Sequence, residues 1–427
     1  MKSSTSTRLI KSINKPITAT IAVPGSKSIT NRALICAALG LGESRIGNYS
    51  DGDDTSLLAN GLNQLGILVR RDGPSLIVEG KGGRVYAPKF PIPVGNAGTT
   101  LRFLVTLAAL ADRGVVFEGS PRMAERPITD LLVALKSLGT DATFEDLFAR
   151  YKVQGGSFRG GTAQLRADRS SQFLSSLLMI APYAQEDVCI EIMGELCSTP
   201  YVAMTVAVMK HFGVEVLHKD YQYQVKAGQL YKPNIFEVEA DASGASYFWG
   251  AAALTNGSIT VQGTRLHSMQ GDLRFLDVLK TMGCLIEESG EGITVAGPGQ
   301  LRAIDIDMND MPDMVPTLAI LALFAKGTTH ILNVSHLQHK ESDRLEALQE
   351  ELRKTGGSIT RSNDGLEING STMHDAQLNT REDHRLAMSF ALLGLKVSGI
   401  SIEKPECVSK SFPNFWKEFD KLYERTN

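Results

Sequence analysis

The sequence predicts an α/β protein of two domains, each built from three copies of one repeated unit. Six helix-like segments rich in small and apolar residues begin at Arg32, Arg102, Gln172, Ala245, Val315 and Arg385, in steps of 70, 70, 73, 70 and 70 residues. A short strand rich in β-branched residues and a second, amphipathic helix follow each of them. The unit is therefore strand, helix, strand, helix, strand, strand.

The first unit opens with a strand near TATIAV and a helix that follows VPGSKSITNR, residues 23–32. Hydroxyls and a lysine at a helix start suit an anion, because the first backbone N–H groups of a helix have no intrahelical partner. The stretch is not a Walker P-loop, since Ser26 and Ile21 stand where that motif needs glycine. A simple capped turn, with Ser28 or Thr30 as N-cap, is the alternative at this point.

The second helices are expected to end at glycine. In five units a glycine closes the amphipathic pattern and a strand begins after it, as at a C′ position. These glycines are Gly66, Gly139, Gly213, Gly283 and Gly356.

The residues before each first helix are polar in all six units: GSKSITN, GNAGTTL, RADRSS, EADASG, NDMPD and TREDH. If the units are equivalent, six helix N-termini can converge, each favouring an anion by about 0.3–1 kcal/mol. We expect a ligand with several negative groups. We also expect the crowded cations to repel one another until that ligand neutralises them.

Composition excludes several classes of protein. The 427 residues suffice for two domains, and a net charge of −3 gives no overall basic field for nucleic acid or membrane. Five scattered cysteines without CxxC spacing indicate reduced thiols and a cytoplasmic location. The apolar runs are too short to span a bilayer, and the first residues lack the apolar core of a secretion signal.

Eight motifs, in order between about residues 20 and 420, resemble the 5-enolpyruvylshikimate-3-phosphate (EPSP) synthase family: PGSKSITNRAL, GNAGTTLRF, ERPITDL, SSQFLSSLL, STPY, HKESDR, EDHRLAM and SKSFPNFW. The resemblance implies a two-domain enolpyruvyl transferase fold with six βαβαββ units, three per domain around a pseudo-threefold axis. We place the chain crossovers near residues 20 and 240. Domain one is then 1–20 plus 241–427, and domain two is 21–240.

The resemblance also implies the reaction. The enolpyruvyl (carboxyvinyl) group of phosphoenolpyruvate moves to the 5-hydroxyl of shikimate 3-phosphate through a tetrahedral intermediate, with domain closure and release of phosphate. This is a step of the shikimate pathway to aromatic amino acids. The implied partners are these two small substrates, with no nucleic acid, membrane, metal or organic cofactor, and the implied state is a monomer.

Site residues follow from the same resemblance. Those implied for shikimate 3-phosphate are Lys27, Ser28, Arg32, Ser170, Ser171, Gln172, Ser198, Tyr201, Asp313 and Lys340. Those implied for phosphoenolpyruvate are Lys27, Gly98, Arg126, Gln172, Arg344, His384, Arg385 and Lys410. The implied catalytic residues are Asp313, Glu341 and Lys27: Asp313 takes the proton of the 5-hydroxyl and Glu341 protonates the methylene carbon, which requires environments that separate their pKa values.

Simpler interpretations stand beside these roles. KESDRLEAL is also typical of an ordinary helix start with acidic residues in its first turn, and EDHR of a solvated charged run. Asp313, Ser170 and Ser171 are also candidate helix caps. We assign no substrate contact to Arg102.

Two positions depart from the family pattern. Phe103 stands where well-known members have proline, which leaves the response to the inhibitor glyphosate open. His336 stands where many members have an asparagine that contacts the 3-phosphate, so that contact is either replaced by the histidine or missing.

Two other functions compete. The related enzyme that acts on UDP-N-acetylglucosamine usually carries a reactive cysteine in its second unit, but no cysteine lies between Cys36 and Cys189. A non-catalytic anion-binding protein would not need an acid–base pair, so Asp313 and Glu341 argue against it.

Overall fold

The computed structural model describes residues 6–424 and divides the chain into two compact units. The discontinuous unit holds the chain up to Pro24 and from Glu239 onward, and the continuous unit is Gly25–Val238. The crossovers that the sequence places near residues 20 and 240 lie close to these two boundaries.

Within the described residues, the continuous unit holds three four-stranded sheets. In each, the first two strands of the order are parallel and the other neighbours are antiparallel. The orders are β14 (Ile235–Glu237), β3 (Leu41–Gly47), β5 (Ser75–Lys81), β4 (Leu68–Asp72); β6 (Ile92–Gly95), β7 (Val115–Gly119), β9 (Arg150–Val153), β8 (Ala142–Glu145); and β10 (Gly161–Arg166), β11 (Val188–Met193), β13 (Gln222–Val225), β12 (Leu217–Lys219).

The discontinuous unit holds two four-stranded sheets and one three-stranded sheet in its described part, with the same mixture of parallel and antiparallel pairs. The orders are β16 (Leu285–Glu288), β17 (Gly292–Ala296), β15 (Ser258–Gln262), β2 (Thr18–Ile21); β18 (Asp305–Asp307), β19 (Thr328–Leu332), β21 (Leu366–Asn369), β20 (Ser358–Arg361); and β1 (Thr7–Leu9), β23 (Ser401–Glu403), β22 (Gln377–Asn379).

The first and fourth copies exchange their leading strands. β2, the strand predicted near TATIAV, precedes the first copy but pairs in parallel with β15 of the fourth. β14 precedes the fourth copy but pairs with β3 of the first. In the sixth copy, β1 from the start of the chain pairs with β23. Six copies are thus confirmed, and within residues 6–424 only the second, third and fifth take all their strands from one continuous segment.

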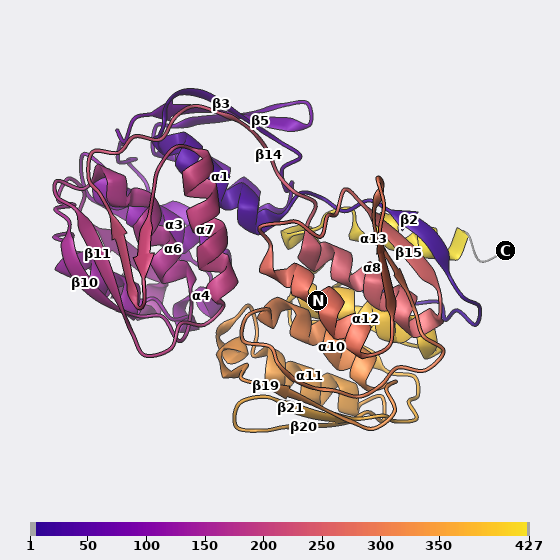
Figure 1. Cartoon of the computed structure of the whole chain (residues 1–427). Coiled ribbons are helices and arrows are strands. Elements are labelled where there is room, and N and C mark those ends of the chain that lie inside the picture. The colour runs from indigo at the N-terminus through magenta and orange to yellow at the C-terminus, as the bar shows by residue number, and fades with distance from the viewer. Residues whose placement is uncertain (1–5, 425–427) are drawn as a thin grey trace. The chain divides into compact units, whose positions relative to one another are not determined.

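The six first helices form the centre of the two units. They are α1 (Lys27–Leu39), α3 (Gly98–Leu107) and α6 (Gln172–Ile180), and α8 (Ala242–Thr255), α10 (Val315–Ala322) and α12 (His384–Lys396). Within each unit the three helices contact one another pairwise, as Figure 1 shows for α8, α10 and α12. This is the predicted threefold arrangement. Every residue of α8 is buried, which explains why these helices are apolar or small on all sides.

Four of these helices begin earlier than the apolar pattern predicts. The largest shift is in α1, which begins at Lys27 instead of Arg32 because its first turn is polar. Its N-cap is Ser26, so the interpretation of Ser28 or Thr30 as N-cap is wrong. Thr30 lies inside the helix, where its hydroxyl donates to the Ser26 carbonyl at 2.8 Å.

In each copy, the second helix follows the first helix along the chain. They are α2 (Asp53–Gln64), α5 (Thr129–Ser137), α7 (Thr199–His211), α9 (Phe275–Thr281), α11 (Arg344–Arg353) and α13 (Phe415–Glu424). The five predicted helix-ending glycines all have positive φ, between 82° and 111°. Glycine adopts this conformation without steric cost, which confirms the predicted helix ends.

Short helical segments precede four of the second helices and the first helix α10, and they carry residues of interest. They are α4 (Pro121–Glu125), η4 (Gly271–Arg274), η5 (Pro312–Met314), η6 (Ser335–His339) and η7 (Pro405–Lys410).

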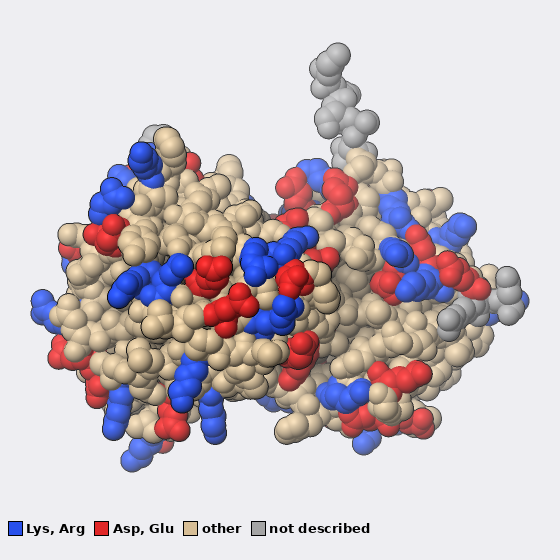
Figure 2. Space-filling view, turned by 90° about the horizontal axis from the view of Figure 1, so that it is seen from above, with Lys and Arg blue, Asp and Glu red and all other residues tan. Residues whose placement is uncertain are grey.

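Both signs of charge are interspersed on the face in Figure 2, in line with the small net charge. Among the described helices, none is long and apolar enough to cross a membrane. The five cysteines are free thiols.

Candidate active site

The beginnings of the two helices within one copy lie beside each other. Contacts of this kind are Lys27 Nζ to Asp54 Oδ2 at 2.9 Å, Arg126 Nη1 to the Asn96 carbonyl at 3.0 Å, Ser243 Oγ to Asp272 Oδ2, and Arg344 Nη1 to Asp313 Oδ1 at 2.9 Å. The partners are 27, 30, 29 and 31 residues apart in the sequence. Each copy therefore brings two polar helix starts together, and most predicted site residues lie at such positions.

Lys27 is the first residue of α1 and forms an ion pair with Asp54 of α2. The exposed fractions of the two side chains are 12% and 3%. The sequence interpretation did not single out Asp54. Its signal is an acidic pair at the start of the second helix, 27 residues after Lys27.

Arg32 lies inside the continuous unit and links α1 to α7. Its Nε donates to Thr205 Oγ1 at 2.7 Å, its Nη1 to the Ser28 carbonyl at 2.8 Å and its Nη2 to the Tyr201 carbonyl at 3.1 Å. Burial lowers the pKa of Arg32 to about 10. The ring of Phe103 lies 5.6 Å from the guanidinium carbon, so this departure from the family pattern packs against Arg32. Arg32 holds Ser28 and Tyr201, two predicted substrate contacts, in one cluster.

The SSQ segment begins α6. Ser171 is the N-cap residue, but its side chain forms no capping hydrogen bond. The Ser170 hydroxyl accepts from the Gln172 backbone N–H at 3.3 Å, and both serines are buried. The capping interpretation therefore fits Ser170 and fails for the side chain of Ser171.

Ser198 combines two unusual features. It is a left-handed non-glycine residue, with φ 54° and ψ 44°, immediately before α7. Its hydroxyl is buried and has no hydrogen-bond partner among the described residues. Strained backbone and an unsatisfied buried hydroxyl are both typical of ligand-binding positions.

Gly98 is the first residue of α3 and lies under two guanidinium groups. A Cβ on this residue would be 2.5 Å from Arg126 Nη2 and 2.9 Å from Arg102 Nη1, so a side chain here would displace both. Arg102 Nη1 donates to Gln172 Oε1 at 2.6 Å. Arg102 therefore fixes the side chain of a predicted substrate contact, a role that sequence reasoning missed.

One guanidinium organises the site residues of the discontinuous unit. Arg344, 1% exposed at the start of α11, donates to Asp313 at 2.9 Å, to Glu341 at 2.9 Å and from Nε to Asp383 at 2.8 Å. Burial alone would lower the pKa of Arg344, but these three carboxylates together outweigh it and raise that pKa above its ordinary value. Asp383 is another residue that sequence reasoning missed.

Asp313 is held between two arginines. Arg385 Nη2 donates to its Oδ2 at 2.5 Å, opposite the bond from Arg344 to Oδ1. Burial opposes ionisation, but the charges of Arg385, Arg344 and Lys340 outweigh it and hold the pKa of Asp313 well below its usual range. Asp313 lies in η5 and does not cap α10, so the interpretation as a simple helix cap is wrong.

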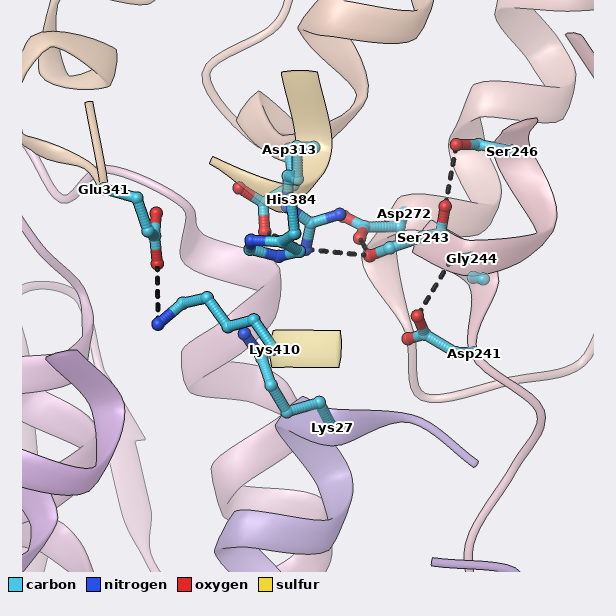
Figure 3. Close-up of polar contacts among 12 residues, drawn as sticks. Lys27, Asp241, Ser243, Gly244, Ser246, Asp272, Asp313, Glu341, His384 and Lys410 are labelled. Atoms are coloured by element: carbon cyan, nitrogen blue, oxygen red, sulfur yellow. Dashed lines mark hydrogen bonds and ion pairs between the residues drawn. The ribbon is translucent and has the colours of Figure 1, made fainter. Parts of the chain in front are cut away.

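Glu341 precedes α11 and contacts two cations. Besides the bond from Arg344, its Oε1 lies 4.0 Å from Lys410 Nζ, as Figure 3 shows. The N-cap of α11 is Asp343, whose carboxylate accepts from the N–H groups of Leu345 and Glu346. Asp343 thus fulfils the ordinary helix-start role, and Glu341 lies outside the helix.

The EDHR segment is not a solvated charged run. Asp383 is fully buried and caps α12 by accepting from the Arg385 N–H at 2.9 Å. His384 and Arg385 are buried as well. Figure 3 shows the hydrogen bond between Ser243 and Asp272, and Arg385 Nη2 lies 3.5 Å from Ser243 Oγ.

His336 is buried in η6, and its Nε2 has no hydrogen-bond partner in the described part of the chain. Burial and the charge of Lys340 lower the pKa of His336 to about 3, so its imidazole is neutral at ordinary pH. The group can still donate one hydrogen bond to an anion.

The fold is that of known proteins. An EPSP synthase structure from Acinetobacter baumannii matches with a TM-score of 0.81 at 24% identity, over 97% of this chain and 98% of that one. The enolpyruvyl transferase NikO from Streptomyces tendae matches with a TM-score of 0.78 at 16% identity, over 98% of both chains. Six sheets in two units, with cations and carboxylates at their helix starts, thus define an enolpyruvyl transferase fold.

Sequence comparison narrows the class to one family. A family model described as EPSP synthase (3-phosphoshikimate 1-carboxyvinyltransferase) matches residues 11–419. The chain is 44% identical over 422 residues to the 3-phosphoshikimate 1-carboxyvinyltransferase of Nostoc punctiforme, covering 97% of this chain and 99% of the relative. It is 45% identical over 412 residues to that of Syntrophobacter fumaroxidans, covering 95% and 97%.

The chain therefore belongs to the EPSP synthase family. It is a transferase of aromatic amino acid biosynthesis, with the EPSP synthase activity of the shikimate pathway. The sequence prediction of family, fold and reaction is confirmed, and both competing functions are set aside.

Proposed function

We propose that Asp313 is the base and Glu341 the acid of the EPSP synthase reaction, and that Arg344 couples these two residues. The observation that supports this most directly is the single buried guanidinium of Arg344, which contacts both Asp313 and Glu341. Because the proposed base and the proposed acid both contact Arg344, a ligand that binds Arg344 changes the proton affinity of both carboxylates.

Shikimate 3-phosphate is the proposed ligand of a set rich in hydroxyl groups. The set is Lys27, Ser28, Arg32, Ser170, Ser171, Gln172, Ser198, Tyr201, Asp313 and Lys340. The buried hydroxyl of Ser198 supports this role, since a phosphate or sugar-like hydroxyl would satisfy it. Arg32 already donates to four protein oxygens, so a contact with substrate requires it to share or exchange one of those bonds.

Phosphoenolpyruvate is the proposed ligand of the more basic set. The set is Lys27, Gly98, Arg126, Gln172, Arg344, His384, Arg385 and Lys410. Guanidinium groups match both its carboxylate and its phosphate with paired hydrogen bonds. Gly98 contributes room, because a side chain there would collide with Arg126.

Substrate binding then makes Asp313 a stronger proton acceptor. Two arginine contacts stabilise the ionised form of Asp313 and so make it a weak proton acceptor. When the anionic groups of phosphoenolpyruvate take hydrogen bonds from Arg344 and Arg385, the pull of these cations on Asp313 weakens. Asp313 becomes more basic at the moment when the 5-hydroxyl must lose its proton.

The same change prepares the acid. Glu341 contacts Arg344 and lies 4.0 Å from Lys410, both proposed phosphoenolpyruvate contacts. A bound anion that engages these cations reduces their stabilisation of the Glu341 carboxylate and favours its uptake of a proton. Glu341 then protonates the methylene carbon, and the tetrahedral intermediate forms.

The domain boundaries, monomeric state, cytoplasmic location and ligand-induced closure of the two units are part of the proposal. Closure is supported by the distribution of the proposed residues, since Lys27 belongs to one unit and Asp313 and Glu341 to the other. The free thiols suit a reducing compartment.

The experiment that tests the residue roles is steady-state phosphate release from both substrates, combined with calorimetric binding. Asp313→Asn and Glu341→Gln should each lower kcat by about 10² or more while shikimate 3-phosphate still binds. Near-normal turnover in either variant would remove that residue from the acid–base pair.

A further inference from the structure

A buried carboxylate lies against the proposed catalytic lysine. Asp54 Oδ2 is 2.9 Å from Lys27 Nζ, and the Asp54 side chain is only 3% exposed. Figure 3 shows Lys27 extending from the start of α1, and Asp54 is the second residue of α2.

Asp54 is also tied to the helix that begins with Gly98. Its backbone carbonyl accepts from Thr100 Oγ1 of α3 at 2.9 Å, and Thr100 is fully buried. One residue on, Thr55 Oγ1 donates to Asn31 Oδ1 of α1 at 3.2 Å. The carboxylate therefore has a fixed backbone, held between two helices that carry proposed substrate contacts.

Helix stabilisation does not explain a carboxylate at this buried position. Asp53 lies in the same first turn of α2 and is exposed, so it can interact with the helix dipole without desolvation. Burying a second carboxylate carries a desolvation penalty, which an ion pair offsets only with good geometry. The contact with Lys27 supplies that geometry.

A lysine ammonium on a four-carbon stem has many conformations, and an enzyme that uses it at a reacting centre must restrict them. We propose that Asp54 is a positioning residue that holds the Lys27 ammonium in its working orientation. The inference rests on the proposed role of Lys27 in the reaction. Asp54 has a second, opposing effect: its negative charge weakens the ground-state binding of anionic substrates beside Lys27.

These two effects predict that loss of the Asp54 charge lowers kcat without weakening the binding of shikimate 3-phosphate. A mere loss of structure would impair both. Asp54→Asn keeps the shape and removes the charge. We expect kcat to fall about tenfold or more, because Lys27 loses its fixed partner. We expect the dissociation constant of shikimate 3-phosphate, measured by calorimetry, to stay unchanged or to fall up to about threefold, because a nearby negative charge is gone.

Asp53→Asn is the matched control, since it removes the same charge from the same helix turn at an exposed position. Its kcat should stay within about twofold of the unchanged enzyme, because an exposed charge contributes little. A similar loss of kcat in both variants would overturn the proposal.

A double-variant cycle tests whether Asp54 acts through Lys27. In a Lys27→Ala background, Asp54→Asn should cause no further loss of kcat. The proposal is overturned if the Asp54→Asn change lowers kcat as much in the Lys27→Ala background as in the unchanged enzyme. It is also overturned if the single Asp54→Asn variant binds substrate more weakly or keeps its kcat. If Asp54→Asn does not fold, Asp54→Glu is used instead, because it keeps the charge but moves it. Its kcat and substrate binding are then compared in the same way, with and without Lys27. Normal turnover of Lys27→Ala alone would contradict the proposed function of Lys27, which separates the two failures.

Discussion

Replacement of Arg344 by lysine keeps the charge but removes the geometry on which the proposed acid–base coupling depends. The guanidinium reaches Asp313, Glu341 and Asp383 through three different nitrogens at 2.8–2.9 Å. A single ammonium cannot span three carboxylates in this arrangement, so at least two of these charge-assisted bonds are lost. At about 1.5–3 kcal/mol each, the loss is about 3–6 kcal/mol. If it falls on the transition state, kcat/KM decreases by about 10²–10⁴.

Phosphate release under saturating shikimate 3-phosphate measures this effect. Arg353→Lys is the control, because Arg353 is an exposed arginine at the other end of α11, where it donates to Ile359 and Thr360 of the neighbouring strand. Thermal unfolding shows whether the Arg344 variant is folded at the assay temperature. A folded Arg344→Lys enzyme with kcat/KM within about threefold of the unchanged protein would refute the coupling, since that ratio corresponds to less than about 1 kcal/mol.

Four further outcomes are expected. Glu341→Gln should lose the proton donor and lower kcat by about 10² or more, and unaltered solvent-hydrogen incorporation at the methyl carbon would contradict this. EDTA should leave phosphate release unchanged, whereas complete inactivation reversed by one divalent ion would show a metal requirement. Glyphosate should compete with phosphoenolpyruvate and inhibit less strongly than in Phe103→Pro, because the buried Phe103 adds bulk beside Arg32; equal inhibition constants would remove that reasoning. Shikimate 3-phosphate should lower the radius of gyration in small-angle scattering more than phosphoenolpyruvate does, and an unchanged radius with calorimetrically confirmed binding would rule out closure.

The repeated unit was predictable because its signals are local. Apolar helices, turn glycines and β-branched strands recur at nearly constant spacing, and each can be identified without knowledge of its neighbours. The exchange of β2 and β14 was not predictable in this way. Which sheet a short strand joins depends on pairing with residues far away in the sequence, such as Thr18 with Ser258 for β2 and Ile235 with Arg45 for β14. The early start of α1 was missed because Lys27 and Ser28 interrupt the apolar pattern on which the prediction depended.

The sequence prediction of the site was limited in a different way. Family motifs identify the residues expected to contact substrate, and the roles of these residues stay predictions. The structure adds residues that act on those side chains: Asp54 on Lys27, Arg102 on Gln172 and Asp383 on Arg344. Such partners have no motif of their own, but a spacing of 27–31 residues between polar helix starts would have found several of the contacts within one copy.

The pairing of cations with carboxylates changes the electrostatic argument for the site. The sequence led us to expect crowded positive charges that repel one another until a polyanion binds. Within each unit, however, the key cations already have internal carboxylate partners: Lys27 has Asp54, and Arg344 has three. Repulsion among these groups is therefore largely compensated before any substrate arrives, and it cannot be the main force that opposes the proposed closure.

In the proposed mechanism, a substrate anion competes with the internal carboxylates for the same hydrogen-bond donors. Each donor that Arg344 or Arg385 gives to phosphoenolpyruvate is one that it withdraws, in part, from Asp313 or Glu341. Binding energy is then linked to the protonation of the two proposed catalytic groups, because the carboxylate that loses a cation becomes the better proton acceptor. Asp54 differs in that two neighbouring helices hold it against Lys27, and its proposed role is to orient the lysine without taking part in proton transfer. In this proposal, the same helix-start geometry serves a substrate-controlled proton transfer in one unit and a rigid positioning contact in the other.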